Sequence, residues 1–409
     1  MRISAFLVLV SILITCSTKP TQLKTGVWRG VVEMQGLQLP FGLEIYKNDN
    51  TYTAAVVNAG EKILLDEVSV TGDSVRIGMH IFDSELRAKI EDGKLEGSFV
   101  KNYDLSATLP FTATFGDTYR FIKTETNVAV DFSGKYALVF DTEKKPYRSV
   151  GILTQTGNEV EGTFLTPTGD YRYLQGNVVG NELLLSTFDG NHTFVFKAHF
   201  EGDSLKGNFY SGKISLESFK GVRDENAVMP DAEKLTFLKE GYHTLDFSFP
   251  DPSGNKISLS DERFKNKVVI LQIFGTWCPN CMDETKFLSP WYDANKHRGI
   301  EVLGLAYERK PDFDYASKRI SIMKEKLQVN YDFVIAGVND KEKAAETLPA
   351  LNHVLSFPTT IFIGKDGAVK HIHTGFTGPG TGIYYDQFKD RFNQIVNELL
   401  SEDLALSKQ

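Results

Sequence analysis

Short runs of alternating apolar and polar residues fill the first half of the chain. From about residue 25 to residue 222 they recur every ten or so residues, separated by glycine, asparagine and aspartate, as in Phe41–Tyr46 and Thr51–Val57. Alternation with a period of two is typical of β-strands that bury one face. Residues 22–222 are therefore expected to form an all-β region, built as an antiparallel sandwich or barrel.

This β-rich region repeats parts of its own sequence. Glu91–Phe99 and Glu201–Phe209 share the pattern Leu-x-Gly-x-Phe, and residues 25–28 are echoed by residues 133–136. The spacing is about 110 residues in both cases. Two related β units would explain the echo, but a hairpin motif that simply recurs would explain it equally well.

The pattern changes in the second half of the chain. Residues 223–239 are charged, contain Pro230 and are expected to be a linker. Beyond it, Lys267–Phe274 is an almost continuous apolar run of the kind found in buried parallel strands, and Pro279–Lys296 suits a helix. Strands and helices then alternate to the end of the chain. Residues 240–402 should therefore form an α/β domain whose central sheet is covered by helices on both faces.

Residues 1–15 have the pattern of a targeting segment. Arg2 is followed by a nearly continuous apolar run that is too short to span a bilayer comfortably. The run ends in Leu13-Ile14-Thr15-Cys16, which resembles the lipobox of bacterial lipoproteins. The resemblance implies that residues 1–15 are removed as a signal peptide and that Cys16 carries lipid. An ordinary secretory peptide with an unmodified Cys16 is the alternative.

Net charge and cysteine content limit the partners and the kinds of site that this chain is expected to have. The 409 residues carry a formal net charge of -8, which argues against a nucleic-acid partner. The chain has three cysteines, and if Cys16 is lipidated the remaining two form one CxxC, so this pair is expected to be reactive rather than structural. A zinc site would need two further Cys or His ligands at suitable spacing, and none is evident. No metal or other cofactor is expected.

The pair Cys278 and Cys281 lies where the buried strand ends and the helix begins. Two intervening residues in a first helical turn bring the two sulfurs close enough to form and break a Cys278–Cys281 disulfide. The helix N-terminus favours the thiolate of Cys278, and Pro279 suits the first helical position because its missing N–H is not needed there. We expect Cys278 to be the exposed nucleophile and Cys281, one turn deeper, to be the resolving thiol.

The segment Phe274–Glu284 resembles the thioredoxin-like disulfide reductases of the bacterial envelope, the TlpA/ResA-like family that includes the cytochrome c maturation thioredoxins. The resemblance extends over about residues 240–400, and none is recognised for residues 25–222. It implies a thioredoxin fold and a thiol:disulfide oxidoreductase. A peroxidase is disfavoured because Gly275, and not a threonine, stands three residues before Cys278.

The same resemblance assigns roles to further residues. The segment Ser356–Thr360 matches the family's cis-proline loop, so Pro358 should follow a cis peptide bond and face the cysteines. Glu284 matches the acid near the buried cysteine and should accept or relay the proton of Cys281, more so because Gln272 replaces the buried acid of cytosolic thioredoxins. Substrate contacts are expected from residues beside the cysteines and the cis-proline: Trp277, Pro279, Phe357 and Thr359.

The leading hypothesis is a lipid-anchored reductase of protein disulfides that faces the periplasm. By resemblance it would take electrons from a membrane thiol donor, and cytochrome c apoprotein is one possible target. A disulfide oxidase or isomerase would use the same residues, because only the reduction potential separates the activities. A third hypothesis places the function in the β-rich region, as a binding protein with a regulatory thioredoxin module.

Overall fold

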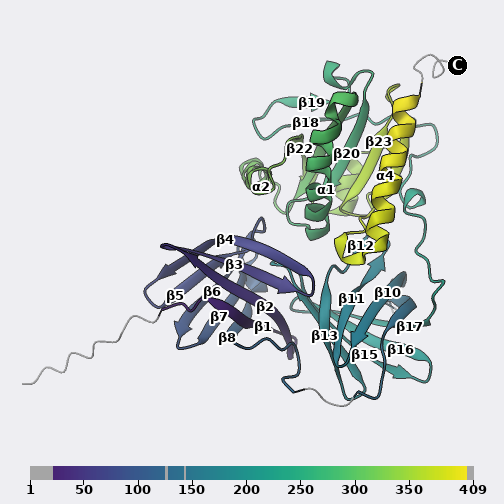
Figure 1. Cartoon of the computed structure of the whole chain (residues 1–409). Coiled ribbons are helices and arrows are strands. Elements are labelled where there is room, and N and C mark those ends of the chain that lie inside the picture. The colour runs from purple at the N-terminus through teal and green to yellow at the C-terminus, as the bar shows by residue number, and fades with distance from the viewer. Residues whose placement is uncertain (1–21, 125–127, 142–143, 403–409) are drawn as a thin grey trace, which may run out of the picture.

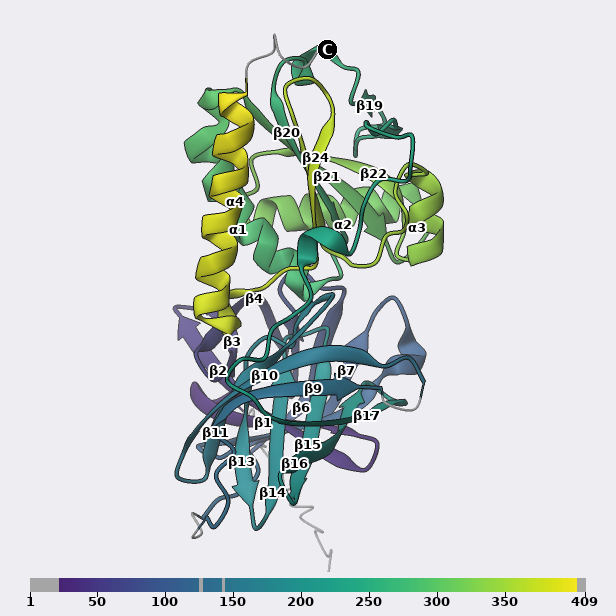
Figure 2. The ribbon, with the colours of Figure 1, turned by 90° about the vertical axis from the view of Figure 1, so that its right-hand side faces the viewer.

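The computed structural model describes residues 22–124, 128–141 and 144–402. It contains two β-barrels and one α/β unit, with both barrels on the same side of the α/β unit (Figures 1 and 2). The fold class expected from the sequence is confirmed, with barrels rather than sandwiches in the β-rich region.

Barrel 1 is a closed ring of eight strands in which each strand pairs with the next and β1 pairs with β8. Along β2, the side chains of Leu39, Phe41, Leu43 and Ile45 are buried at alternate positions, because successive residues of a strand face opposite sides. The strands are β1 (Gly26–Met34), β2 (Leu37–Asn48), β3 (Thr51–Asn58), β4 (Glu61–Thr71), β5 (Ser74–Gly78), β6 (Ser84–Glu91), β7 (Lys94–Lys101) and β8 (Leu109–Phe115).

Barrel 2 has the order β10-β9-β17-β16-β15-β14-β13-β11, and pairing of β10 with β11 joins its ends into a second ring of eight. Its interior is aromatic, with Phe196 and Phe209 stacked at 4.6 Å between ring centroids. The strands are β9 (Gly134–Phe140), β10 (Tyr147–Thr156), β11 (Glu159–Thr166), β12 (Gly169–Asp170), β13 (Leu174–Val179), β14 (Glu182–Phe188), β15 (Thr193–Glu201), β16 (Ser204–Ser211) and β17 (Ser215–Arg223). The two-residue β12 extends from β11 outside the ring.

The echoed sequence segments occupy equivalent places in the two barrels. Each barrel opens with a glycine at positive φ, Gly26 at 123° and Gly134 at 128°. Near the start of each first strand an aromatic side chain donates to the carbonyl four residues earlier, Trp28 to Lys24 at 3.1 Å and Tyr136 to Phe132 at 2.8 Å. The second echo forms the β6–β7 hairpin in barrel 1 and the β15–β16 hairpin in barrel 2. These equivalences favour duplication over a recurring hairpin.

The α/β unit is a five-stranded sheet of order β22-β21-β20-β23-β24. All seven residues of the central strand β20 are buried, as predicted for a strand covered on both faces. Figure 2 shows α1 and α4 on one side of the sheet and α3 on the other. The elements are β18 (Ser248–Pro250), β19 (Lys256–Ser258), β20 (Val268–Phe274), α1 (Pro279–Asn295), β21 (Ile300–Glu308), α2 (Phe313–Lys326), β22 (Asp332–Val338), α3 (Lys341–Thr347), β23 (Thr359–Ile363), β24 (Val369–Thr374) and α4 (Ile383–Ser401). Short 3₁₀ helices span Leu105–Ala107, Ala232–Lys234, Glu262–Phe264, Lys296–Arg298 and Pro379–Thr381.

Buried contacts join the three parts. Phe41 of barrel 1 packs on Phe188 of barrel 2, with 4.4 Å between ring centroids. Arg319 of α2 donates to the carbonyl of Ile81 in barrel 1. In the segment after barrel 2, Glu233 accepts hydrogen bonds from Arg391 of α4. Within the described ranges, no helix combines the length and apolar character needed to cross a bilayer.

Candidate active site

The two cysteines lie at the start of α1, directly after β20. Cys278 is the N-cap of the helix, and Pro279 occupies the first helical position. The backbone N–H of Cys281 donates to Cys278 Sγ at 3.2 Å, so a helix-terminal N–H points at this sulfur. The Cα atoms of the two cysteines are 5.2 Å apart and the sulfurs are joined as a disulfide. The spacing therefore produces the geometry that the sequence predicts.

The prediction that Cys278 is exposed is wrong. Its relative exposure is 5%, against 1% for Cys281. Cys281 is more buried than Cys278, as expected. Barrel 2 and loops of the α/β unit, however, together cover the first turn of α1. No local signal in the CxxC reveals this cover, because the covering residues lie more than a hundred positions earlier in the chain.

The predicted cis-proline loop faces the cysteines. The Phe357–Pro358 peptide bond is cis, and the Phe357 carbonyl oxygen lies 3.3 Å from Cys278 Sγ. The Trp277 ring packs edge-on against Phe357 at 5.6 Å, and its Nε1 donates to the Tyr307 carbonyl at 2.8 Å. Thr359 is fully buried, and its hydroxyl donates to the Ser356 carbonyl at 2.9 Å. Thr359 thus supports the loop from within.

Glu284 lies one turn beyond Cys281, with its carboxyl group fully buried. It accepts hydrogen bonds from Gln272 Nε2 at 2.8 Å and from the Thr360 hydroxyl. Burial raises the pKa of Glu284 to about 7, and the two hydrogen bonds oppose that rise. A carboxyl group with this pKa exchanges a proton readily near neutral pH.

A loop of barrel 2 covers the opposite side of the site. Asn280 Nδ2 donates to the Asp170 carbonyl at 3.1 Å, and the Ser356 hydroxyl donates to the Thr168 carbonyl at 2.7 Å. The backbone N–H of Gly378 donates to the Asp170 carboxylate at 2.7 Å. Barrel 2 is therefore hydrogen-bonded both to the helix that carries the cysteines and to the cis-proline loop.

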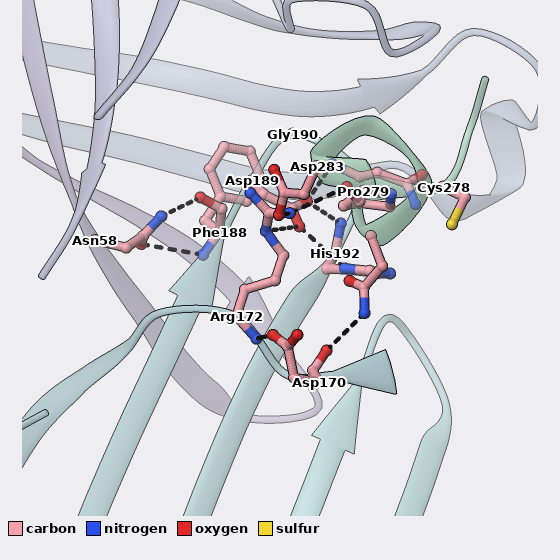
Figure 3. A network of polar contacts seen from close by, with 12 residues as sticks. Asn58, Asp170, Arg172, Phe188, Asp189, Gly190, His192, Cys278, Pro279 and Asp283 are labelled. Atoms are coloured by element: carbon pink, nitrogen blue, oxygen red, sulfur yellow. Dashed lines mark hydrogen bonds and ion pairs between the residues drawn. The ribbon is translucent and has the colours of Figure 1, made fainter. Parts of the chain in front are cut away.

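Arg172, next to this loop, is the centre of a buried polar network (Figure 3). Its guanidinium donates to the Pro279 carbonyl at 3.1 Å and forms ion pairs with Asp283 of α1 and Glu61 of barrel 1. Asp189 of barrel 2 lies 3.5 Å from Arg172 Nε. One side chain thus links both barrels to the first turns of α1.

A cavity of about 220 Å³ remains between barrel 2 and Cys278. Its lining residues are Thr166, Thr168, Gly169, Asp170, Tyr171, His192, Phe194, Trp277, Cys278, Pro279, Asn280, Lys341, Ser356 and Phe357. Among the residues with described positions, no group of three or more His, Cys, Asp or Glu side chains is placed to hold a metal ion.

The structure thus brings together every predicted site residue of the α/β unit. Sequence reasoning missed the contributions of barrel 2, among them Asp170, Arg172 and His192. Their strand pattern is that of any barrel, so nothing in it pointed to the site. The predicted signal peptide and Cys16 lie outside the described residues.

Comparisons with known proteins agree with this geometry. Residues 241–372 match the AhpC/TSA family. The thiol-disulfide oxidoreductase ResA of Geobacillus kaustophilus is 31% identical over 142 residues, which are 34% of this chain and 72% of that protein. ResA of Bacillus subtilis is 27% identical over 150 residues, which are 37% of this chain and 74% of that protein.

A solved thiol-disulfide oxidoreductase from Bacteroides fragilis is 22% identical, with a TM-score of 0.27. The match covers 36% of this chain and 99% of that one.

Three findings lead to one assignment. They are the cysteine pair, the cis-proline loop, and the sequence identity to ResA over most of the length of ResA. The chain belongs to the TlpA/ResA-like family of thioredoxin-fold thiol-disulfide oxidoreductases, and it is an enzyme of that class.

Proposed function

We propose that this enzyme reduces protein disulfides in the bacterial envelope through the dithiol of Cys278 and Cys281. The observation that carries the proposal is the hydrogen bond from the Cys281 N–H to Cys278 Sγ at the start of a 17-residue helix. That contact and the helix dipole stabilise negative charge on Cys278. The Cys278 thiolate attacks a substrate disulfide and forms a mixed disulfide, which Cys281 then resolves.

Glu284 supplies the proton transfer that resolution requires. Cys281 must lose its proton before it attacks, and its surroundings are buried and apolar. The carboxylate of Glu284, with a pKa near 7, takes up this proton at neutral pH. Gln272 cannot replace it, because a neutral amide has no site for a further proton.

Substrate contacts come from the edge of the site. Phe357, which precedes Pro358, presents a backbone carbonyl beside Cys278. Trp277 and Pro279 flank the same sulfur and offer apolar surface, while Thr359 holds the loop in place from inside. We assign Phe357, Trp277 and Pro279 to substrate binding on this basis.

We infer the location and the partners from the targeting pattern of the sequence and from the family of the relatives. Lipid on Cys16, after removal of residues 1–15, would anchor the enzyme at the membrane, facing the periplasm. A membrane thiol donor would return the Cys278–Cys281 disulfide to the dithiol after each turnover. Residues 240–402 would be the catalytic domain, joined through residues 223–239 to the β-rich region of residues 22–222.

Trapping in cells tests this function. Replacement of Cys281 by serine should leave covalent adducts on Cys278, because the mixed disulfide is then not resolved. The Cys278→Ser variant is the matched control and should form none. In wild-type cells the pair should be mostly reduced at steady state. A pair that is mostly oxidised would indicate the oxidase alternative, and an absence of adducts would contradict the proposal.

A further inference from the structure

Arg120 is a buried cation whose hydrogen-bond partners are all neutral. It lies between the two barrels, in the segment that follows β8, and is 7% exposed. Its guanidinium donates to two carbonyl oxygens and two side-chain amide oxygens, those of Pro40, Val57, Asn58 and Gln175. Within the described ranges, no carboxylate forms an ion pair with it. A buried charge without a counter-ion is unfavourable, so this place favours an anion.

The contrast with Arg172 shows what is missing. Burial lowers the pKa of Arg172, but the surrounding carboxylates outweigh burial and raise this pKa. For Arg120, burial and the nearby charge of Arg29 lower the pKa to about 9, and Glu161, which is exposed, opposes this fall only in part. The same type of side chain is therefore compensated in one place and uncompensated in the other.

A cavity of about 190 Å³ lies beside the Arg120 side chain. Residues of both barrels and of the segment between them line it, among them Arg29, Glu44, Asp117, Tyr119, Arg120 and Gln175. It shares no lining residue with the cavity at Cys278. Its two carboxylates are already paired, Glu44 with Lys62 at 2.6 Å and Asp117 with Lys123 at 2.9 Å. The charges of the two arginines therefore remain in excess.

Two side chains of this lining have an N–H without an acceptor. Arg29 of β1 donates through Nε and Nη2 to the carbonyl oxygens of Tyr119 and Arg120, and its Nη1 donates to no group in the described part of the chain. Gln175 of β13 accepts at Oε1 from Ala59 N–H at 3.0 Å and from Arg120 Nε at 2.9 Å. These two bonds fix the orientation of the amide and leave its Nε2 free. Both side chains are partly exposed, and neither nitrogen is sealed from solvent.

We propose that this cavity between the barrels binds a small monocarboxylate. Arg29 Nη1 and Gln175 Nε2 donate to the carboxylate oxygens, and the negative charge of the ligand compensates the buried guanidinium of Arg120. A single negative charge is favoured over a higher one, because Glu44 and Asp117 line the same cavity. The site is separate from the cysteines and goes beyond the proposed dithiol function.

Equilibrium dialysis of the full chain with radiolabelled propionate tests this site at constant ionic strength in chloride buffer. Propionate should bind saturably and be displaced by an excess of unlabelled propionate. Propionamide has nearly the same shape without the charge and should not displace it, and inorganic phosphate should displace it less well than propionate does. An absence of saturable binding, or equal displacement by propionamide, would overturn the inference. Better displacement by phosphate would overturn the choice of a monocarboxylate.

Variants of the two donors locate the binding. Arg29→Gln should weaken it at least about tenfold, the effect of a charge-assisted hydrogen bond. Arg148→Gln, at an exposed position of barrel 2, is the matched control and should keep the wild-type affinity. Unchanged affinity in Arg29→Gln would contradict the proposed donor.

Gln175→Glu provides a test with the opposite sign on stability. It replaces the free Nε2 by an oxygen and brings a carboxylate to Arg120 Nε, so the chain then supplies its own counter-ion. Propionate binding should be lost, while the thermal unfolding midpoint in propionate-free buffer should rise. Retained binding, or a lower midpoint, would show that the cavity does not lack an anion.

Discussion

Arg172 Nη1 of barrel 2 donates a 3.1 Å hydrogen bond to the carbonyl oxygen of Pro279, the residue that directly follows the first active-site cysteine. The same guanidinium pairs with Asp283 one turn further along α1. A carbonyl in the first turn of a helix normally accepts from the helix itself, and here it also accepts from another part of the protein. The orientation of the CxxC turn and the position of barrel 2 are therefore coupled.

Removal of this guanidinium should destabilise the whole chain. Arg172→Met leaves the carboxylates of Asp283, Glu61 and Asp189 buried beside an apolar side chain, which costs about 3–5 kcal/mol for a broken buried ion pair. Urea unfolding of the oxidised protein measures the loss. Arg148→Met, at an exposed position of the same barrel, should stay within about 0.5 kcal/mol of wild type. Equal stability of the two variants would show that the network contributes little.

The pH dependence of resolution should report Glu284. As the base, its carboxylate must be ionised, so the rate at which Cys281 resolves the mixed disulfide should rise with pH through about 7 and then level off. Glu284→Gln should lower this rate by about 10²-fold and abolish the inflection. Rapid-mixing kinetics of a preformed mixed disulfide measures the rate of resolution at each pH.

Thr360→Val provides the matched control, because it removes a hydrogen bond that lowers the pKa of Glu284. Its inflection should move to higher pH. An inflection that stays in place in Thr360→Val and persists in Glu284→Gln would assign it to another group.

The free energy of unfolding should change with pH because of the Glu284 carboxyl group. Its pKa is about 7 in the folded protein and 4.5 in an unperturbed glutamic acid. Between these values the folded state holds a proton that the unfolded state has released, so the free energy of unfolding falls as pH rises. The loss amounts to about 3 kcal/mol at pH 8 relative to pH 4. Glu284→Gln should show less of this decrease, and parallel curves for the two proteins would refute the assignment.

Accessibility of Cys278 should depend on one glycine of barrel 2. Gly169 has a φ of 141°, and a Cβ at this position would collide with Asn280 Nδ2. Gly169→Ala should therefore displace the loop and speed alkylation of reduced Cys278 several-fold. Gly134→Ala, with a φ of 128° and its nearest neighbouring atom, Glu225 Oε1, 3.6 Å from the Cβ, carries similar backbone strain without the collision and should leave the alkylation rate unchanged. Equal rates for both variants would mean that the loop does not limit access.

Membrane attachment should depend on Cys16. Cys16→Ser should abolish incorporation of labelled fatty acid and move the protein from the membrane fraction to the soluble fraction, because acyl chains supply the anchoring free energy. The Cys278→Ser/Cys281→Ser double variant should keep its lipid. Labelling that survives in Cys16→Ser would place the lipid elsewhere or contradict lipidation.

Local sequence was sufficient for much of the fold. The strand β20 and the helix α1 were predicted within a residue or two, because a continuous apolar run, a CxxC and Pro279 mark the junction. The two echoed segments left duplication and a recurring hairpin open, and their equivalent places in two barrels favour duplication. The sequence did not decide between sandwich and barrel. Closure depends on the pairing of β1 with β8, whose partners Val32 and Phe111 are 79 positions apart, and not on the alternation within any strand.

The sequence by itself determined that Cys278 and Cys281 lie together at the start of a helix, since four consecutive residues mark that start, and it predicts Cys278 as the nucleophile. Only the tertiary structure decided that Cys278 is covered. Arg172 and Asp283 are 111 positions apart, and each would suit an exposed surface if considered alone. Their pairing, and with it the covered cysteine, arises from the packing of barrel 2 on α1, and neither composition nor periodicity encodes that contact.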